Sequence, residues 1–190
     1  IVISTSGIPE LKEIWRGALE LKLGSGATYS EALPYLDQYF PAFGAVVRRV
    51  GSRQIRNLGT IAGNLATASP IGDTLPCLIA LGASVRLRAA TVREMPVEEF
   101  ITGYRKTALN KGEFIEAIRI PRLDAGRRFF AYKISKRFDQ DISAVIAAFC
   151  IEVGDGKVTA LRAVYGGMAA TPKRAAHAEA ALIGKPWTPD

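Results

Sequence analysis

The chain has 190 residues, 48% of them hydrophobic, which is enough to bury the core of one or two domains. Its net charge of +7 is spread along the sequence without a nucleic-acid-binding motif, and this argues against a nucleic-acid partner. One histidine and two cysteines without metal-ligand spacing leave little scope for a protein metal site, and no apolar run is long enough to cross a membrane.

The two ends and the cysteines bear on the context of the chain. Residues 1–4 look like the tail of a strand, with neither an initiator methionine nor a signal-peptide pattern, and the sequence ends as abruptly at Asp190. We therefore expect a fragment of a longer protein. Cys77 and Cys150 lie in apolar segments, which is typical of buried thiols in a reducing compartment, so we expect a cytoplasmic location.

The first third of the sequence alternates helix and strand patterns. In chain order we predict a helical turn over 8–14, a half-buried strand over 18–23, a turn over 24–26 and a helical region over 28–50 that breaks near Pro41. Thr28 or Ser30 is the predicted cap of that helical region, because both side chains can accept a hydrogen bond from a free backbone N–H.

The middle of the chain begins with a stretch of little periodicity. Residues 51–76 are rich in Gly, Asn, Thr and Ser, so we predict a long functional loop, with a helix starting near Ser69 and Pro70. A short apolar helix over 77–81 and strands over 85–88 and 114–120 are expected to follow.

Residues 123–126 form the best domain boundary, which predicts one domain over 1–124 and a second over 125–190. In the second, strands over 144–153 and 158–165 are predicted to form a hairpin through Asp155 and Gly156, and a helix over 172–183 to end at Gly184. Strands mixed with helices without a βαβ rhythm indicate an α+β fold.

The stretch 59–73 carries the most chemistry. Its small residues would let a ligand approach the backbone closely, and its hydroxyl, amide and carboxylate groups can bind phosphate and sugar oxygens. It matches neither the Walker nor the Rossmann fingerprint. From the residues alone it is either a phosphate or nucleotide loop or an ordinary polar loop.

Motifs in four places resemble the flavin-binding region of the molybdenum hydroxylases, and the xanthine dehydrogenases in particular. They are residues 57–64 followed by Ser69-Pro70-x-x-Asp73, residues 103–107, residues 129–133 with Arg137, Asp141 and Ile142, and residues 165–169. The resemblance implies that residues 1–124 are the second part of a two-subdomain FAD-binding domain of the PCMH or vanillyl-alcohol-oxidase-like type. It also implies that the N-terminal subdomain, with its Gly-rich pyrophosphate loop, is missing. A small α/β flavoprotein C-terminal domain, expected to be truncated, would follow over 125–190.

The resemblance also implies a set of cofactor-binding residues. Val50 and Gly51 would lie beside the flavin, although Val50 stands where the family often has an aromatic residue. The other implied contacts are Thr60, Gly63, Asn64, Thr67 and Ser69 to the pyrophosphate and ribityl regions, Asp73 to a sugar or ribityl hydroxyl, Ile115 to the adenine or flavin, and Lys133 as a donor to the cofactor.

The loop 134–142 is implied to lie over the flavin and to influence which acceptor takes its electrons. Gln140 stands where the family has an acidic residue, flanked by Asp139 and Asp141, and we place Asp141 at the cofactor. A carboxylate would disfavour the anionic reduced flavin, so the amide of Gln140 should shift the flavin potential.

The implied function is the FAD-binding electron-transfer module of a xanthine dehydrogenase. Hypoxanthine or xanthine would be hydroxylated at a molybdopterin centre, and electrons would pass through 2Fe-2S clusters to FAD and then to NAD+. The molybdenum-binding and iron–sulfur parts would lie on missing segments or on partner chains of a hetero-oligomer, and no residue of this chain would be catalytic or bind a metal. The alternatives are the flavin part of a carbon monoxide dehydrogenase, aldehyde oxidase or aromatic-CoA reductase, or a non-redox basic nucleotide-binding module.

Overall fold

The computed structural model describes residue 5 and residues 7–188, so the strand end predicted for residues 1–4 lies outside the described residues. In chain order the elements are η1 (Pro9–Lys12), β1 (Ile14–Arg16), β2 (Glu20–Gly24), α1 (Tyr29–Tyr39), α2 (Pro41–Arg48), α3 (Arg53–Arg56), α4 (Ile61–Thr67), α5 (Leu75–Ala80), β3 (Ser84–Arg88), β4 (Val92–Pro96), α6 (Val97–Phe100), β5 (Ile101–Gly103), β6 (Lys106–Thr107), β7 (Phe114–Pro121), β8 (Arg127–Ile134), β9 (Val145–Gly154), β10 (Lys157–Gly166), β11 (Lys173–Arg174) and α7 (Ala176–Leu182).

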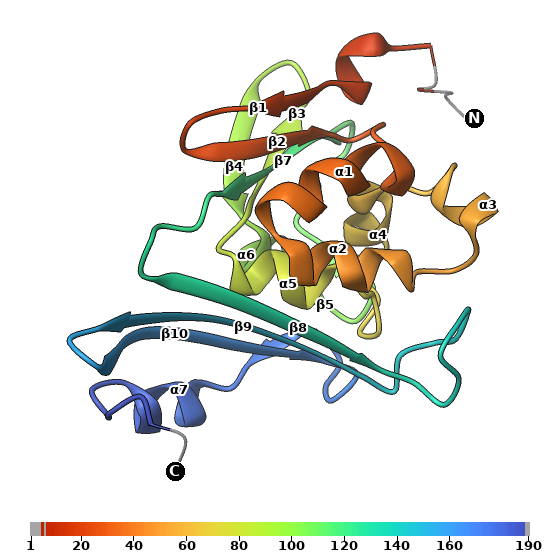
Figure 1. The fold of residues 1–190 in the computed structure, drawn as a ribbon. Helices are drawn as coiled ribbons and strands as arrows, with labels where there is room; N and C mark the ends of the chain where they lie inside the picture. Colours follow the sequence, from red (N-terminus) through yellow and green to blue (C-terminus); the bar gives the residue numbers. More distant parts are fainter. Residues whose placement is uncertain (1–4, 6, 189–190) are drawn as a thin grey trace.

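Two antiparallel sheets enclose a layer of helices (Figure 1). The first has the strand order β1-β2-β7-β3-β4 and the second the order β11-β10-β9-β8, with a small β5-β6 ribbon beside them. Helices α1, α2, α4 and α5 lie between the sheets, and α7 lies against the outer face of the second sheet. This arrangement confirms the predicted α+β class.

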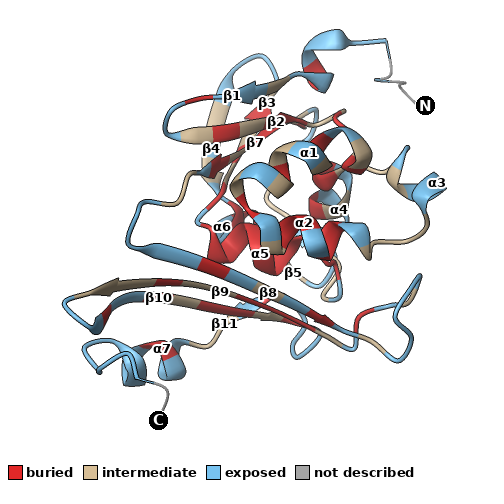
Figure 2. Ribbon diagram, in the orientation of Figure 1, coloured by how far each residue is buried: buried red, intermediate tan, exposed pale blue. Residues whose placement is uncertain are grey.

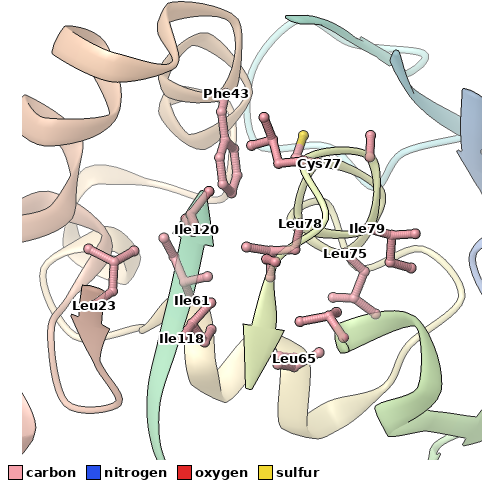
Figure 3. Close-up of a cluster of buried hydrophobic side chains, with 14 of the residues drawn as sticks. Leu23, Phe43, Ile61, Leu65, Leu75, Cys77, Leu78, Ile79, Ile118 and Ile120 are labelled. Atoms are coloured by element: carbon pink, nitrogen blue, oxygen red, sulfur yellow. The ribbon is translucent and has the colours of Figure 1, made fainter. Parts of the chain in front are cut away.

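The hydrophobic core extends from the first sheet through the helices to the inner face of the second sheet (Figure 2). Every residue of α5 is buried, because this helix packs against β9 and β10 of the second sheet and against α6. Ile118 and Ile120 of β7 meet Leu78 of α5 and Phe43 of α2 in this core (Figure 3). Burying each of these side chains stabilises the fold by roughly 1.5–3 kcal/mol.

Most predicted elements are confirmed where a local signal specified them. Thr28 caps α1 in a capping box, in which its side chain accepts from the Glu31 backbone and the Glu31 side chain accepts from the Thr28 backbone, while Ser30 donates to Asn57 instead. Pro41 begins α2 at the predicted break. The β9–β10 hairpin turns at Asp155 and Gly156 with φ of 50° and 70°, as a type I′ turn requires.

Two predicted helix positions and the predicted loop were wrong. Residues 51–76 are not one loop, because Ser52 and Thr60 cap the short helices α3 and α4 through their side-chain oxygens. Ser69 and Pro70 lie in a turn and begin no helix, whereas the helix predicted over 77–81 forms as α5, which begins two residues earlier, at Leu75.

The predicted helix over 172–183 also begins later, at Ala176, because Lys173 and Arg174 pair with β10 as a short edge strand. The prediction omitted β8, whose residues 127–134 pair along their whole length with β9. Among the described residues, no helix is both long and apolar enough to span a bilayer.

Candidate functional site

Segments far apart in the sequence meet at a cleft of about 230 Å³ beside the α2 end of the helical layer. Its walls come from the turn after α2, from α4 and the segment after it, and from the β8–β9 connection. The lining residues are Gly51, Asn64, Ile71, Asp73, Lys133, Gln140, Asp141, Ile142 and Ser143.

The segment 68–73 is where all four sequence motifs converge. The Arg105 backbone N–H of the second motif donates to Ala68 O at 3.2 Å, and the Gly167 N–H of the fourth donates to Pro70 O at 2.8 Å. Lys133 of the third motif donates to Asp73 of the first at 2.5 Å. Motifs separated by up to a hundred residues therefore build one local structure.

Asp73 is the buried charge at the base of the cleft. Lys133 Nζ donates to its Oδ2 at 2.5 Å, and Ser143 Oγ donates to its Oδ1 at 2.5 Å. The side chains of Lys133 and Asp73 are only 2% and 10% exposed. Both bonds are charge-assisted and are shielded from water, so they hold the carboxylate in a fixed orientation.

The charge of Asp73 also reaches groups behind the cleft. Burial, and next the Asp73 charge, raise the pKa of the Tyr29 phenol above its usual value. The same two causes raise the pKa of the Cys77 thiol, which is fully buried. Both groups therefore stay neutral, and Cys77 behaves as the buried apolar side chain predicted from the sequence.

Asn64 presents its amide donor to the cleft. Its Oδ1 accepts from both the backbone N–H and the hydroxyl of Thr74, at 3.2 and 2.6 Å. No hydrogen bond to another described residue uses the Asn64 Nδ2, so this group is free to donate to a ligand oxygen.

The hydroxyls predicted to bind the cofactor also shape the backbone around α4. Thr60 Oγ1 accepts from the Gly63 N–H at 2.8 Å, Thr67 Oγ1 donates to Asn64 O at 2.7 Å, and Ser69 Oγ accepts from the Ile71 N–H at 3.4 Å. Because a hydroxyl can donate and accept, Thr60 keeps its hydrogen and Thr67 its lone pairs for a ligand. Gly63 and Thr67 are exposed on this helix.

Asp141 organises the loop that forms the remaining wall. Its carboxylate accepts from the Arg137 and Ile142 N–H groups at 2.8 and 2.9 Å. These bonds, led by that from the Arg137 backbone, lower the pKa of Asp141. Gln140 beside it has φ of 51° and is exposed at the mouth of the cleft.

The predicted site residues fall into three groups. Gly51, Asn64, Asp73, Lys133 and Asp141 line the cleft. Thr60, Gly63, Thr67 and Ser69 lie on α4 or directly next to it. Val50 and Ile115 do not line the cleft: Val50 packs against the hydrophobic core, and Ile115 on β7 is 7% exposed within it.

The sequence analysis missed one residue that lines the cleft and one that holds the loop beside it. Ser143 lies just beyond the third motif and completes the Asp73 hydrogen bonds. Arg49 donates to Lys133 O, Ser135 Oγ and Phe138 O, although these acceptors are more than 80 residues away along the chain. No local pattern signals such contacts, because arginines at helix ends are usually solvated charges.

The donor set fits one side of a flavin nucleotide. The free Asn64 amide and the hydroxyls around α4 suit phosphate oxygens, the Asp73 carboxylate suits a sugar hydroxyl, and Ile71 and Ile142 add apolar surface at the rim. A cleft of about 230 Å³ holds only part of a dinucleotide. Among the described residues, no group of three or more His, Cys, Asp or Glu side chains could hold a metal ion.

Comparison with known families agrees with this site. Residues 1–123 match the family described as the FAD binding domain in molybdopterin dehydrogenase, and residues 130–190 match the CO dehydrogenase flavoprotein C-terminal domain. The chain therefore belongs to the flavin-binding family of the molybdenum hydroxylases, and the resemblance predicted from its motifs is confirmed.

Individual relatives act on different substrates. The chain is 42% identical over 154 residues to a xanthine dehydrogenase of Emericella nidulans, which covers 80% of this chain and 11% of that protein. It is 32% identical over 195 residues to the nicotinate dehydrogenase FAD-subunit of Eubacterium barkeri, covering 99% of this chain and 66% of that one. The carbon monoxide dehydrogenase structure from Hydrogenophaga pseudoflava superposes with a TM-score of 0.90 at 28% identity, covering 97% of this chain and 65% of that chain.

The chain thus spans about a tenth of the length of the first curated relatives that it matches.

Proposed function

We propose that this chain is the FAD-binding electron-transfer module of a xanthine dehydrogenase. In this proposal, electrons from the hydroxylation of hypoxanthine or xanthine at a molybdenum centre pass through iron–sulfur clusters to FAD and then to NAD+. The observation that carries the proposal is the convergence of the four motifs on the segment 68–73, at a cleft whose donors suit a flavin nucleotide. The 42% identity with a xanthine dehydrogenase supports the finer assignment.

FAD, when bound, supplies the chemistry, since it accepts electrons and passes them on. The residues of this chain bind and orient it. Asn64 Nδ2 and the hydroxyls of Thr60 and Thr67 would donate to or accept from its phosphate and ribityl oxygens, and Asp73 would accept from a sugar hydroxyl. Lys133 holds the Asp73 carboxylate in a fixed orientation, and Asp141 shapes the loop beside the flavin.

The remaining parts of the enzyme belong to the same proposal. The molybdopterin and 2Fe-2S centres would lie on other segments or on partner chains of a cytoplasmic hetero-oligomer. Within this chain we propose a boundary at residue 124 between the FAD-binding domain and the flavoprotein C-terminal domain. The two family matches, which end at 123 and begin at 130, support this boundary.

The second candidate is the flavin part of a related molybdenum hydroxylase, such as a carbon monoxide dehydrogenase, aldehyde oxidase or aromatic-CoA reductase. The nicotinate dehydrogenase FAD-subunit and the carbon monoxide dehydrogenase structure each match nearly the whole chain, which favours keeping this candidate. A substrate that reacts at a molybdenum centre would not touch the cleft described here, so the cleft does not separate the two candidates.

Anaerobic mixing experiments on the full-length protein, purified with its partners, test the proposal. We expect a coloured protein that releases flavin on denaturation and whose visible absorbance is bleached by xanthine and restored by NAD+. Bleaching by nicotinate or carbon monoxide but not by xanthine would contradict the xanthine dehydrogenase assignment and favour the second candidate. A colourless protein that releases no flavin on denaturation would contradict both and favour a non-redox nucleotide-binding module.

A further inference from the structure

A reciprocal pair of hydrogen bonds joins the end of α2 to the end of β8. Arg49 Nη1 donates to Lys133 O at 2.6 Å, and Lys133 Nζ donates to Arg49 O at 3.2 Å. Each long side chain thus binds the other residue's backbone. Because Lys133 also donates to Asp73, this clamp fixes the cleft base and the start of the β8–β9 connection to one another.

Arg49 extends the clamp into the loop over the cleft. Its Nη2 donates to Ser135 Oγ at 3.0 Å and its Nε donates to Phe138 O at 3.2 Å. Its guanidinium carbon lies 4.8 Å from the centre of the Phe138 ring, a cation–π distance. Three different guanidinium nitrogens of Arg49 thus donate to three separate acceptors. The planar fork of an arginine allows this geometry, whereas the donors of a lysine all lie on one nitrogen.

The loop has few other restraints. Residues 136–140 are exposed, and their remaining hydrogen bonds stay inside the loop, from Ser135 to Arg137 and from Arg137 to Asp141. Over the part of the chain that the structure describes, the bonds that reach residues 135–140 from outside the loop come from Arg49. Without them, the loop would be held only at its two ends.

We propose that Arg49 is a positioning residue: it holds the loop 135–142 over the cleft beside Asp73 and so sets the surroundings of the flavin without touching it. This inference rests on the proposed function, because it takes the cleft as the flavin site. With the loop in place, the Asp141 carboxylate lies in the cleft wall. Displacing the loop removes that negative charge, which makes the reduced, anionic flavin easier to form.

The test compares Arg49→Lys, Arg49→Met and Phe138→Leu in the flavin-loaded full-length protein. Arg48→Met is the matched control, because Arg48 is the last residue of α2, next to Arg49, and pairs with Asp37 with half of its side chain exposed. We expect both Arg49 variants to speed hydrogen exchange at the Arg137 and Ile142 amides by about tenfold or more, since each lost hydrogen bond shifts a local opening equilibrium by roughly that factor. The flavin midpoint potential should become more positive in the same variants. Phe138→Leu should show a smaller change in the same direction, and Arg48→Met neither.

Several outcomes would overturn the proposal. Unchanged amide exchange in Arg49→Met would show that Arg49 does not hold the loop. Faster exchange with an unchanged midpoint potential would reduce Arg49 to a structural role. Full retention of both properties in Arg49→Lys would show that charge suffices and that the fork geometry is irrelevant. If the wild-type protein holds no flavin, the proposed function fails, while the exchange measurement still tests whether Arg49 holds the loop.

Discussion

Replacing Lys133 with Met probes the ion pair at the base of the cleft. Methionine keeps most of the side-chain length but removes the charge that pairs with Asp73. The Asp73 carboxylate would stay buried with the Ser143 hydroxyl as its remaining side-chain donor. Because breaking a buried ion pair by removing one partner leaves an uncompensated charge, we expect a loss of about 3–5 kcal/mol in the free energy of unfolding.

The assay is urea unfolding of the flavin-free protein, followed by circular dichroism at neutral pH. Lys22→Met is the matched control, since Lys22 pairs with Glu13 at 3.3 Å with 33% and 58% of the two side chains exposed. An exposed pair of this kind contributes about 0–1 kcal/mol. If Lys133→Met cost no more than Lys22→Met, with the same dependence on urea, the account of Asp73 as a fixed, buried charge would be refuted.

Three further predictions concern acid stability, one turn and the loop. The pKa of Glu113 is lowered to about 2, first by the hydrogen bond from Arg93, so its stabilising contribution is complete above the ordinary value of 4.5 and is lost as the pH falls toward 2. The melting temperatures of wild type and Glu113→Gln should therefore converge across that window, and a constant difference would contradict this. Gly167 has φ of 85° and an added Cβ would lie 2.4 Å from Ala144 O, so Gly167→Ala should cost about 1–3 kcal/mol more than Gly112→Ala, where φ is 83° in open space; equal melting temperatures would argue against it. Gln140→Asp should make the flavin midpoint potential more negative, because a carboxylate disfavours the anionic reduced flavin. The substitution should not disturb the backbone, since aspartate tolerates the left-handed conformation at this position. An unchanged potential together with an unchanged NAD+ rate would count against a role for Gln140.

Local signals predicted the elements whose cause is local. The capping box at Thr28 and the turn at Asp155 and Gly156 depend on residues within a few positions of each other, so their sequence suffices. Helix α4 was not predicted, because Gly63 and Asn64 lower the helix propensity of its sequence. Its packing against β7 stabilises it in the fold.

The candidate site was predictable only in part, because several of its contacts join residues that are far apart in the sequence. The family resemblance of the motifs predicted Asp73 and Lys133 as site residues. It did not predict that the two side chains pair with each other. Ser143 enters the cleft, and Arg49 reaches the loop beside it, through contacts that span at least 70 residues. Ile115 lies in a core that its strand pattern alone does not locate. Such contacts depend on how the two sheets pack on the helices.

FAD titration into the deflavinated full-length protein tests most directly whether the face of α4 binds the cofactor. Gly63→Leu places a side chain on the exposed face of that helix, where the nearest atom to a new Cβ is Thr60 Oγ1 at 3.0 Å, and Gly126→Leu is a control at an exposed site with ordinary contacts. We predict that Gly63→Leu weakens FAD binding by at least about tenfold, because a leucine blocks close approach to the backbone, while its melting temperature stays close to that of wild type. Equal FAD affinity in wild type, Gly63→Leu and Gly126→Leu would contradict the account.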